Sequence, residues 1–313
     1  MSGPVLGPAP SLAADRLPNA PAWVYLLRCA DGSLYAGWTN DLARRLKAHR
    51  TGAGGAKYTK SHGRDAVRLA YAERCADKPA ALRREAALKK LPKAQKEALA
   101  ADWAARSRLT LRMATPEDAP AVTELYNWYV THGTQTFQYE PSTVEEYRRN
   151  IADVLENAPF LVAYTADGRL AGYACAHPWH TRRAFAWDVE TTVYCAPDLL
   201  GQGAGRRLYT ALLELLRRQG YVNAFALITR PNPQSDAFHR ALGFTRYGVE
   251  KNSGYKFGRW LDLGYWALPL NPPADPPAPV RLRLPQAEVE AVLRQAVIQQ
   301  KTAAQSGFAR NCF

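Results

Sequence analysis

Apolar and polar positions alternate along the chain in two blocks, and each block predicts its own set of strands and helices. In the first block, Asp31-Gly32 between two apolar stretches is typical of a hairpin turn. Thr39-Asn40-Asp41 supplies N-cap chemistry for a basic helix that ends near Arg50. The elements predicted around these signals are strands at Trp23–Arg28, Ser33–Trp38 and Val67–Glu73, then two Lys- and Arg-rich helices separated near Pro92.

The pattern restarts at Arg108 with a longer series of elements. Thr115-Pro116-Glu117-Asp118 combines an N-cap residue with proline in the first turn, so it predicts the start of a helix ending near Val130. The other predicted elements are strands at 109–113, 160–165 and 170–178, a long strand at 184–195, helices at 143–157 and 205–219, and then a strand, a helix and two strands that end near Leu270.

The two ends of the chain differ in composition from these blocks. Residues 1–21 are rich in Pro, Ala and Gly and lack the basic start and apolar stretch of a signal peptide, which predicts a disordered leader. Half of residues 271–280 are proline, as in a linker. Beyond it, one helical face carries apolar residues that either dock on a domain or pair with another chain, and we favour docking: Val289, Val292, Leu293, Ala296 and Val297. The expected divisions are 1–21, 22–106, 108–270 and 271–313.

Positive charge is concentrated in the first block. Residues 1–108 contain 20 Lys and Arg against 9 Asp and Glu, whereas residues 109–270 contain 16 of each. A compact basic domain attracts polyanions, of which nucleic acid is the commonest, although a basic surface can also serve solubility alone. No apolar run is long enough to cross a bilayer. The five scattered cysteines form no C-x-x-C pair, which favours reduced thiols in the cytoplasm.

A glycine-rich turn between a strand and a helix lies in the segment Val189–Leu216. Gly201-Gln202-Gly203-Ala204-Gly205 exposes backbone N–H groups beside the positive end of a helix dipole, an arrangement that binds pyrophosphate. Many tight turns before helices look the same, so this turn alone leaves both interpretations open. The strand before it contains Glu190. Partial burial in an apolar strand is expected to raise the pKa of this carboxyl group, which suits it to accept a proton near neutral pH.

The second block resembles the GNAT acetyltransferases, specifically their phosphinothricin acetyltransferase-like branch. The resemblance rests on the glycine turn, where Leu200 replaces the usual leading Arg or Gln, and on motifs in the same order across the block: Tyr126-Asn127-Trp128-Tyr129, Thr136-Phe137, Gly172-Tyr173-Ala174, Pro178-Trp179, Val189-Glu190, Val193-Tyr194, Asn232, Ser235, His239, Gly243-Phe244 and Lys256-Phe257-Gly258-Arg259-Trp260. It implies an α/β (α+β) domain with a mixed central sheet flanked by helices. It also implies acetyl-CoA-dependent N-acetyl transfer, an acyl transfer of groups other than aminoacyl, to a small amino acid or a phosphinothricin-like analogue.

The same resemblance implies roles for individual residues. Glu190 is the expected base, and His239 is the expected donor of a proton to the departing thiolate. The expected acetyl-CoA contacts are Val193, Tyr194, Gly201, Gln202, Gly203, Ala204, Gly205, Arg206, Asn232 and Ser235. Phe137 and fixed cations that recognise an anionic group on the acceptor are the expected substrate contacts: Arg182, Arg183, Lys256 and Arg259. His180 follows Pro178-Trp179 where the branch has Arg. Members of the branch are often dimers, which makes a homodimer an expectation.

The first block resembles the small GIY-YIG nucleases, which implies a three-stranded sheet with helices. Trp23-Val24-Tyr25 and Tyr35-Ala36-Gly37 correspond to the two name-giving motifs, with bulky Trp23 in place of glycine. Asp41, Arg45 and His49 follow at the family's spacing. The implied catalytic residues are Tyr25, Tyr35, Arg45 and His49, and Glu85 is the implied ligand of Mg²⁺ or Mn²⁺.

Three overall interpretations follow. The chain is a bifunctional acetyltransferase and nuclease, or an acetyltransferase fused to a module that binds nucleic acid without cutting it. In the third, the acetyl acceptor is a protein or peptide amine instead of a free amino acid. EDTA and Glu85→Ala distinguish the first two. If the chain is a nuclease, either change abolishes nicking of DNA and leaves its retention intact, whereas a module that only binds DNA has no nicking to lose.

Overall fold

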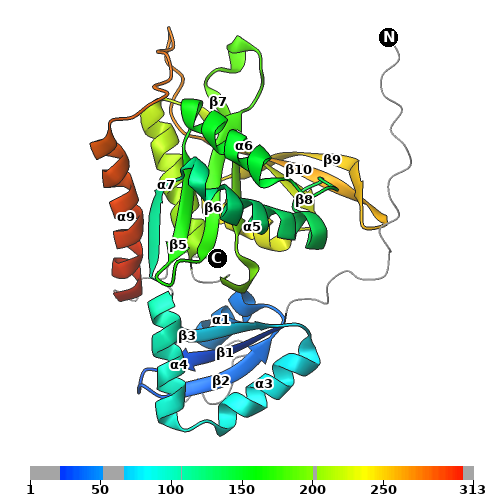
Figure 1. The fold of residues 1–313 in the computed structure, drawn as a ribbon, viewed down its shortest axis with the longest axis vertical. Coiled ribbons are helices and arrows are strands. Elements are labelled where there is room, and N and C mark those ends of the chain that lie inside the picture. Colours follow the sequence, from blue (N-terminus) through cyan, green and yellow to red (C-terminus); the bar gives the residue numbers. More distant parts are fainter. Residues whose placement is uncertain (1–21, 52–66, 107, 200–202, 306–313) are drawn as a thin grey trace.

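The computed structural model describes residues 22–51, 67–106, 108–199 and 203–305, and these form a small and a large unit (Figure 1). The small unit has a three-stranded antiparallel sheet of order β2-β1-β3. Gly32, at φ 79°, turns the chain between the first two strands, as the hairpin prediction requires. The elements are β1 (Ala22–Arg28), β2 (Leu34–Thr39), α1 (Leu42–Thr51), β3 (Arg68–Cys75), α3 (Lys78–Lys90) and α4 (Lys93–Arg106).

The central strand β1 is buried on both faces, and its alternating side chains enter two different clusters. Val24 and Leu26 pack with Leu88 of α3. Tyr25 and Leu27 point to the other face, where leucines of α1 lie. This alternation places the phenol of Tyr25 beside α1, the helix that carries two of the residues predicted to act with it.

The large unit contains a seven-stranded sheet of order β4-β5-β6-β7-β8-β10-β9. All neighbouring strands in it are antiparallel except β7 and β8, which are parallel and joined by a crossover through α7. The elements are β4 (Leu109–Met113), α5 (Ala119–His132), α6 (Val144–Asn157), β5 (Phe160–Thr165), β6 (Leu170–Pro178), β7 (Asp188–Cys195), α7 (Ala204–Gln219), β8 (Asn223–Arg230), α8 (Pro233–Ala241), β9 (Thr245–Lys256) and β10 (Arg259–Pro269).

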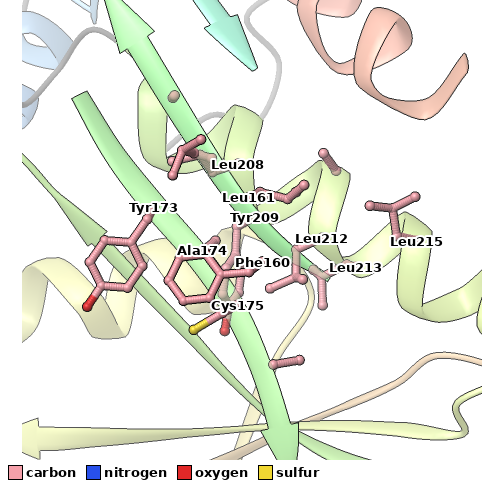
Figure 2. Packing of buried hydrophobic residues seen from close by; sticks show 14 of the residues in the cluster. Phe160, Leu161, Tyr173, Ala174, Cys175, Leu208, Tyr209, Leu212, Leu213 and Leu215 are labelled. Carbon is pink, nitrogen blue, oxygen red and sulfur yellow. The ribbon is translucent and has the colours of Figure 1, made fainter. Parts of the chain in front are cut away.

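Helices cover both faces of this sheet, as expected for the mixed α/β fold. The leucines of α7 and the buried side chains of β5 and β6 form the centre of the core (Figure 2). On the opposite face, the rings of Tyr126 and Tyr129 from α5 lie 5.4 and 5.0 Å from the ring of Tyr194 in β7. The sheet therefore separates an α7 face from an α5–α6 face, and successive residues of β7 point to one or the other.

The prediction of one strand from residue 184 to 195 was wrong at its start. Arg183–Phe185 form a 3₁₀ turn, and β7 begins only at Asp188. The reason is the length of the partner strand, because β6 ends at Pro178, which pairs with Val189. Residues 184–187 therefore have no neighbouring strand with which to form a ladder.

The chain after β10 lies against the large unit. Asn271 donates from Nδ2 to the carbonyl oxygens of Arg217 and Tyr221, and the N–H of Arg281 donates to the carbonyl of Gln219. Helix α9 (Gln286–Gln305) then packs on α7 and β4, with Val292 and Ala296 buried. Docking of the apolar stripe on the domain is confirmed for Val292 and Ala296. Hydrogen bonds from Asn271 and Arg281 hold the proline-rich segment against the domain.

Candidate active sites

The parallel strands β7 and β8 form a fork. They pair only at Asp188–Asn223, Val189–Ala224 and Glu190–Phe225, although both strands continue beyond the last pair. On its other side β7 stays paired with β6 as far as Cys195. Past Glu190, the β8-facing edge of β7 therefore offers unpaired backbone groups to a ligand, because those groups need hydrogen-bond partners. Val193 and Tyr194 lie on this free stretch.

The open end of the fork meets the start of α7. Gly203 is the N-cap residue of α7 and has φ 81°, in the left-handed region that favours glycine. A Cβ atom at Gly205 would lie 2.9 Å from Sγ of Cys195, so a larger residue there would displace the strand. Ala204 is buried and Arg206 is half-buried on the same turn. Gly201 and Gln202 lie outside the described residues.

Glu190 sits at the branch point of the fork. Its side chain is half-buried on the α5–α6 face, and it accepts no hydrogen bond from any described residue. Burial raises the pKa of this carboxyl group above its ordinary value. A carboxylate that lacks an internal partner and holds a proton more readily is suited to take one from a ligand.

On the α7 face, three side chains from three elements form a hydrogen-bonded chain behind the fork. Oγ1 of Thr191 donates to the carbonyl oxygen of Phe225 at 2.8 Å and lies 2.6 Å from the hydroxyl of Tyr209. That hydroxyl lies 3.2 Å from Nε2 of His239. The Thr191 hydroxyl thus bridges β7 and β8 where their backbone ladder ends, and Tyr209 connects this bridge to the imidazole.

His239 is only 5% exposed, and both of its ring nitrogens have partners. Nδ1 lies 2.9 Å from the carbonyl oxygen of Ser235, an acceptor only, so Nδ1 carries a proton. Thr191 uses its one hydroxyl hydrogen on Phe225, so Tyr209 donates to Thr191 and accepts from Nε2 when the ring carries a proton on both nitrogens. Burial lowers the pKa of His239, which makes this protonated ring a ready proton donor. The imidazole therefore reaches the fork through the Tyr209 hydroxyl and not directly, a contact that the sequence did not reveal.

A loop after α5 lies over the α5–α6 face of the fork. Tyr194 donates from its hydroxyl to the carbonyl of Gln135. Nζ of Lys256, whose side chain is fully buried, donates to the carbonyl of Thr136 at 2.9 Å, and burial lowers its pKa to about 8. The ring of Phe137 fills the space beside Gly254, where a Cβ atom would lie 2.5 Å from it. The loop is thus fastened to β7 and to the β9–β10 hairpin.

The remaining predicted contacts lie at the start of α8, on the 3₁₀ turn before β7 and on β10. Oδ1 of Asn232 caps α8 by accepting from the N–H of Ser235 at 3.1 Å. Arg182 and Arg183 are exposed at the 3₁₀ turn before β7. Arg259 is half-buried at the start of β10, and its Nε is buried without a described partner. The structure brings Lys256 to the loop over the fork and leaves both arginines of the turn in solvent.

The small unit gathers its predicted residues around the Tyr25 hydroxyl. Nε2 of His49 lies 2.9 Å from this oxygen, and Nε of Arg45 donates to it at 3.2 Å. The ring of Tyr35 lies 5.3 Å from that of His49. Burial raises the pKa of Tyr25 to about 12 and lowers that of His49 to about 4. Tyr25 therefore keeps its proton near neutral pH and donates it to the uncharged imidazole.

Glu85 of α3 completes this group and is close enough to raise the pKa of Tyr25. Its carboxylate lies 2.9 Å from Nζ of Lys89, and its side chain is 13% exposed. Among the described residues no three His, Cys, Asp or Glu side chains stand together as a metal cluster. Glu85 thus offers one oxygen donor, which fits Mg²⁺, because this ion keeps several waters when one or two carboxylates hold it.

Comparison with known proteins now decides the family. Residues 111–264 match the acetyltransferase (GNAT) domain, and residues 21–98 match the GIY-YIG catalytic domain. The chain is 39% identical over 176 residues to the phosphinothricin N-acetyltransferase of Streptomyces viridochromogenes, covering 56% of this chain and 95% of that enzyme. The chain belongs to the GNAT acetyltransferases. It carries a GIY-YIG domain ahead of its GNAT domain.

Other relatives of this GNAT domain agree. The L-methionine sulfoximine/L-methionine sulfone acetyltransferase of Pseudomonas paraeruginosa is 35% identical, with coverage of 54% of this chain and 98% of that enzyme. A phosphinothricin acetyltransferase from Sinorhizobium meliloti, solved in complex with acetyl-CoA, matches with a TM-score of 0.51 and 34% identity over 52% of this chain and 89% of that chain. The predicted GNAT and GIY-YIG relationship and the mixed α/β fold are confirmed.

Sequence reasoning missed three residues beside the fork: Thr191, Tyr209 and His177. Tyr209 and His177 lie on other elements than Glu190 and His239, so no spacing along the chain connects them with these residues. Thr191 follows Glu190 directly, but only the strand register shows that it lies at the branch point of the fork. None of the helices among residues 22–51, 67–106, 108–199 and 203–305 is long and apolar enough to span a membrane.

Proposed function

We propose that the GNAT domain transfers the acetyl group of acetyl-CoA to the amine of a small amino acid that carries a second anionic group, such as phosphinothricin or methionine sulfoximine. The observation that carries this proposal is the fork between β7 and β8 with Glu190 at its branch point. The relatives named above supply the acceptor class, because their own names contain these compounds.

The free edge of β7 and the start of α7 would hold the acetyl donor. Backbone groups at Val193 and Tyr194 have no β8 partner, and they suit the amide groups of a pantetheine arm. The N–H groups of Gly203, Ala204 and Gly205 at the start of α7 would bind a pyrophosphate at a helix N-terminus, and Gly201 and Gln202 are proposed to contact it as well. Asn232, Ser235 and Arg206 are proposed as further contacts. When bound, acetyl-CoA supplies an activated thioester.

Glu190 is the proposed base. It takes a proton from the incoming ammonium, so that the neutral amine attacks the acetyl carbon and the bond from that carbon to sulfur breaks. Its raised pKa brings the carboxyl closer to the pH at which the enzyme would operate. The thiolate takes a proton from the protonated ring of His239, passed through the Tyr209 hydroxyl at the fork, and the ring takes a replacement proton from solution before the next turnover. For each ammonium and each acetyl-CoA consumed, the products are one amide, one thiol and one proton released from the ammonium.

The acceptor would lie beneath the fastened loop on the α5–α6 face. Phe137 and the buried Lys256 line this region from the loop and the hairpin. One of the three N–H groups of Lys256 is used by Thr136, which leaves two to bind a carboxylate or phosphinate. Arg259 is a second candidate cation, and Arg182 and Arg183 stand at the rim.

A screen of acetyl acceptors tests this proposal. The full chain is incubated with acetyl-CoA and one amine at a time, and free thiol is measured. We expect turnover with phosphinothricin, methionine sulfoximine or methionine sulfone, and much less with peptides bearing a free N-terminus or lysine. Turnover confined to peptide or protein amines would replace the small-molecule acceptor by a protein one.

For the GIY-YIG domain we propose binding of nucleic acid and metal-dependent cleavage. Two observations favour this second function: the net charge of +11 over residues 1–108, and the four side chains around Tyr25, which are Tyr35, Arg45, His49 and Glu85. Arg45 would neutralise phosphate charge, and Glu85 would hold a Mg²⁺ or Mn²⁺ ion that polarises the phosphate. Because the Tyr25 side chain is 1% exposed and Tyr35 is half-buried, Tyr35 is the better placed of the two to orient water, with His49 behind it.

We further propose a cytoplasmic protein that forms homodimers. Cys29, Cys75, Cys175 and Cys195 are free thiols, as a reducing compartment maintains them. Tyr247, Tyr255 and Trp260 of the β9–β10 hairpin are 57, 43 and 61% exposed, an apolar surface of the kind that copies of a chain bury against each other. Sedimentation of the wild type and of Trp260→Glu tests the dimer, which the substitution should dissociate.

A further inference from the structure

One ionisable side chain on the strand next to Glu190 has no role in the proposed acetyl transfer. His177 of β6 is the direct register partner of Glu190 across the β6–β7 ladder. Antiparallel partners project from the same face of a sheet, with Cβ atoms about 5 Å apart. The same row continues with Tyr173 opposite Tyr194, whose rings lie 5.5 Å apart. The side chains of His177 and Glu190 therefore project from neighbouring positions on the acceptor side of the sheet.

The contacts of His177 leave it able to exchange a proton. Its Nε2 lies 3.6 Å from Sγ of Cys175, two residues earlier on the same face, and no other described residue forms a hydrogen bond with the ring. Burial raises the pKa of Cys175 to about 12, so this neighbour stays a neutral thiol. No described residue forms a hydrogen bond with the other ring nitrogen, Nδ1. One ring nitrogen of His177 thus contacts the Cys175 thiol, and the other is available for proton exchange.

The other titratable groups near this pair are phenols that keep their protons. Tyr209 lies behind β7 with a pKa well above neutral because of burial, and Tyr265 of β10 donates its hydroxyl to Glu250 at 2.7 Å. Within the described residues, no Lys or Arg forms an ion pair with Glu190 or His177. A proton placed on Glu190 therefore has the imidazole as its one nearby basic neighbour in that part of the chain.

Burial acts on the two groups in opposite directions. It raises the pKa of Glu190 above its ordinary value and lowers that of His177 below its ordinary value. Both shifts reduce the preference for a proton that a free imidazole has over a free carboxylate. A neutral imidazole in this position can accept a proton from a carboxylic acid and release it to water.

We propose that His177 is a proton-relay residue that removes the substrate's proton from Glu190 in each turnover. The proton passes from the ammonium to Glu190, from the Glu190 carboxylic acid to His177, and from the imidazolium to water or buffer. Glu190 is thereby a carboxylate again before the next amine arrives. This inference rests on the proposed role of Glu190 as the base.

Chemical rescue tests the relay. His177→Ala leaves room for a free imidazole molecule beside Glu190, whereas His132→Ala removes a histidine that stacks on Trp128 and serves as the matched control. In a weakly buffered solution we expect kcat of His177→Ala to fall on the order of tenfold or more. Added imidazole should restore kcat in proportion to its neutral form. KM for acetyl-CoA should stay within about twofold, because His177 lies on the β6 side of the fork.

The possible results separate the two proposals. If His177→Ala folds poorly, the same rescue is measured on His177→Gln after its thermal unfolding has been checked. Unchanged kcat of these variants, or a fall that imidazole does not restore, would overturn the relay. A Glu190→Gln variant with full activity would instead overturn the base itself. Slow Glu190→Gln together with normal His177→Ala removes the relay and leaves the base in place.

Discussion

The hydroxyl of Tyr209 lies 3.2 Å from Nε2 of His239 and joins this buried imidazole to the fork between β7 and β8. The link continues through Thr191, whose Oγ1 donates to the carbonyl of Phe225 at the last register pair of the parallel strands. His239, which is only 5% exposed, is thereby linked by hydrogen bonds to the place where the acetyl group is expected. The same chain of bonds ties α8, α7, β7 and β8 together behind the proposed cofactor site.

Removing that hydroxyl tests whether this chain serves turnover as well as stability. In Tyr209→Phe a buried nitrogen of His239 loses its partner, which costs about 1–3 kcal/mol and lowers Tm by about 2–4 °C per kcal/mol. We expect kcat to fall as well. Tyr221→Phe is the control, because Tyr221 is 6% exposed and donates to the carbonyl of Asn157 away from the fork. Equal kcat in the two variants would show that the link is structural alone.

The glycine at the start of α7 is expected to affect the acetyl donor only. Gly203 at φ 81° and Gly168 at φ 80° both adopt the left-handed conformation, so alanine strains the backbone at either position by about 1–2 kcal/mol. Gly168 lies in the turn between β5 and β6, away from the fork. We expect Gly203→Ala to raise KM for acetyl-CoA several-fold, whereas Gly168→Ala leaves it unchanged. Initial rates at varied acetyl-CoA decide this, and a similar effect of both substitutions would contradict the location of the cofactor site.

The buried lysine should set the affinity for an anionic acceptor. Its pKa of about 8 means that Lys256 is charged below that pH and loses its charge as the pH rises through it. We therefore expect KM for phosphinothricin to rise above about pH 8 in the wild type. In Lys256→Met we expect KM to be raised about tenfold or more at neutral pH. Lys251→Met removes an exposed lysine paired with Asp262 on the same hairpin and should change neither value. A pH-independent KM would remove Lys256 from acceptor binding.

Substitution of Glu85 in the GIY-YIG domain should abolish cleavage of DNA and leave binding of DNA intact. Glu85→Gln removes the proposed metal ligand, so nicking of plasmid DNA in Mg²⁺ should be abolished, as it should be by EDTA in the wild type. Retention of DNA should persist and weaken with salt, since phosphate contacts are salt-sensitive. Glu97→Gln, which breaks the pair with Arg28, is the control and should still nick. Nicking by Glu85→Gln at the wild-type rate would contradict the metal site. Loss of retention at low salt in the wild type would remove both nucleic-acid proposals.

Local chemistry explains why so many elements could be predicted from the sequence. Apolar runs closed by turn residues predicted β4, β5 and β6 to the residue, and the helix expected at 143–157 corresponds to α6. Glu190 was predicted from an apolar strand that precedes a glycine turn. The start of β7 could not be predicted, because it depends on where the partner strand β6 ends.

Contacts between distant elements were beyond the reach of the sequence. Nothing in the order of residues shows that Lys256 donates to Thr136, 120 positions away, or that Tyr209 lies between Thr191 and His239. These contacts depend on the long-range register of the sheet and on the packing of α7 and α8 against it. Burial, which raises the pKa of Glu190 and lowers that of His177, is likewise a property of the assembled fold.

The account depends most on Glu190 as the base, and the pH dependence of turnover tests this most directly. In the wild type, kcat/KM for the acceptor should rise with pH as Glu190, with its raised pKa, loses its proton. Glu190→Gln should be slower by about 10²-fold or more at pH 7 and approach the wild type at high pH, where free amine is plentiful. Glu214→Gln, which alters a surface ion pair on α7, should follow the wild-type profile. A Glu190→Gln variant that stays within about twofold of the wild type at pH 7 would contradict the account.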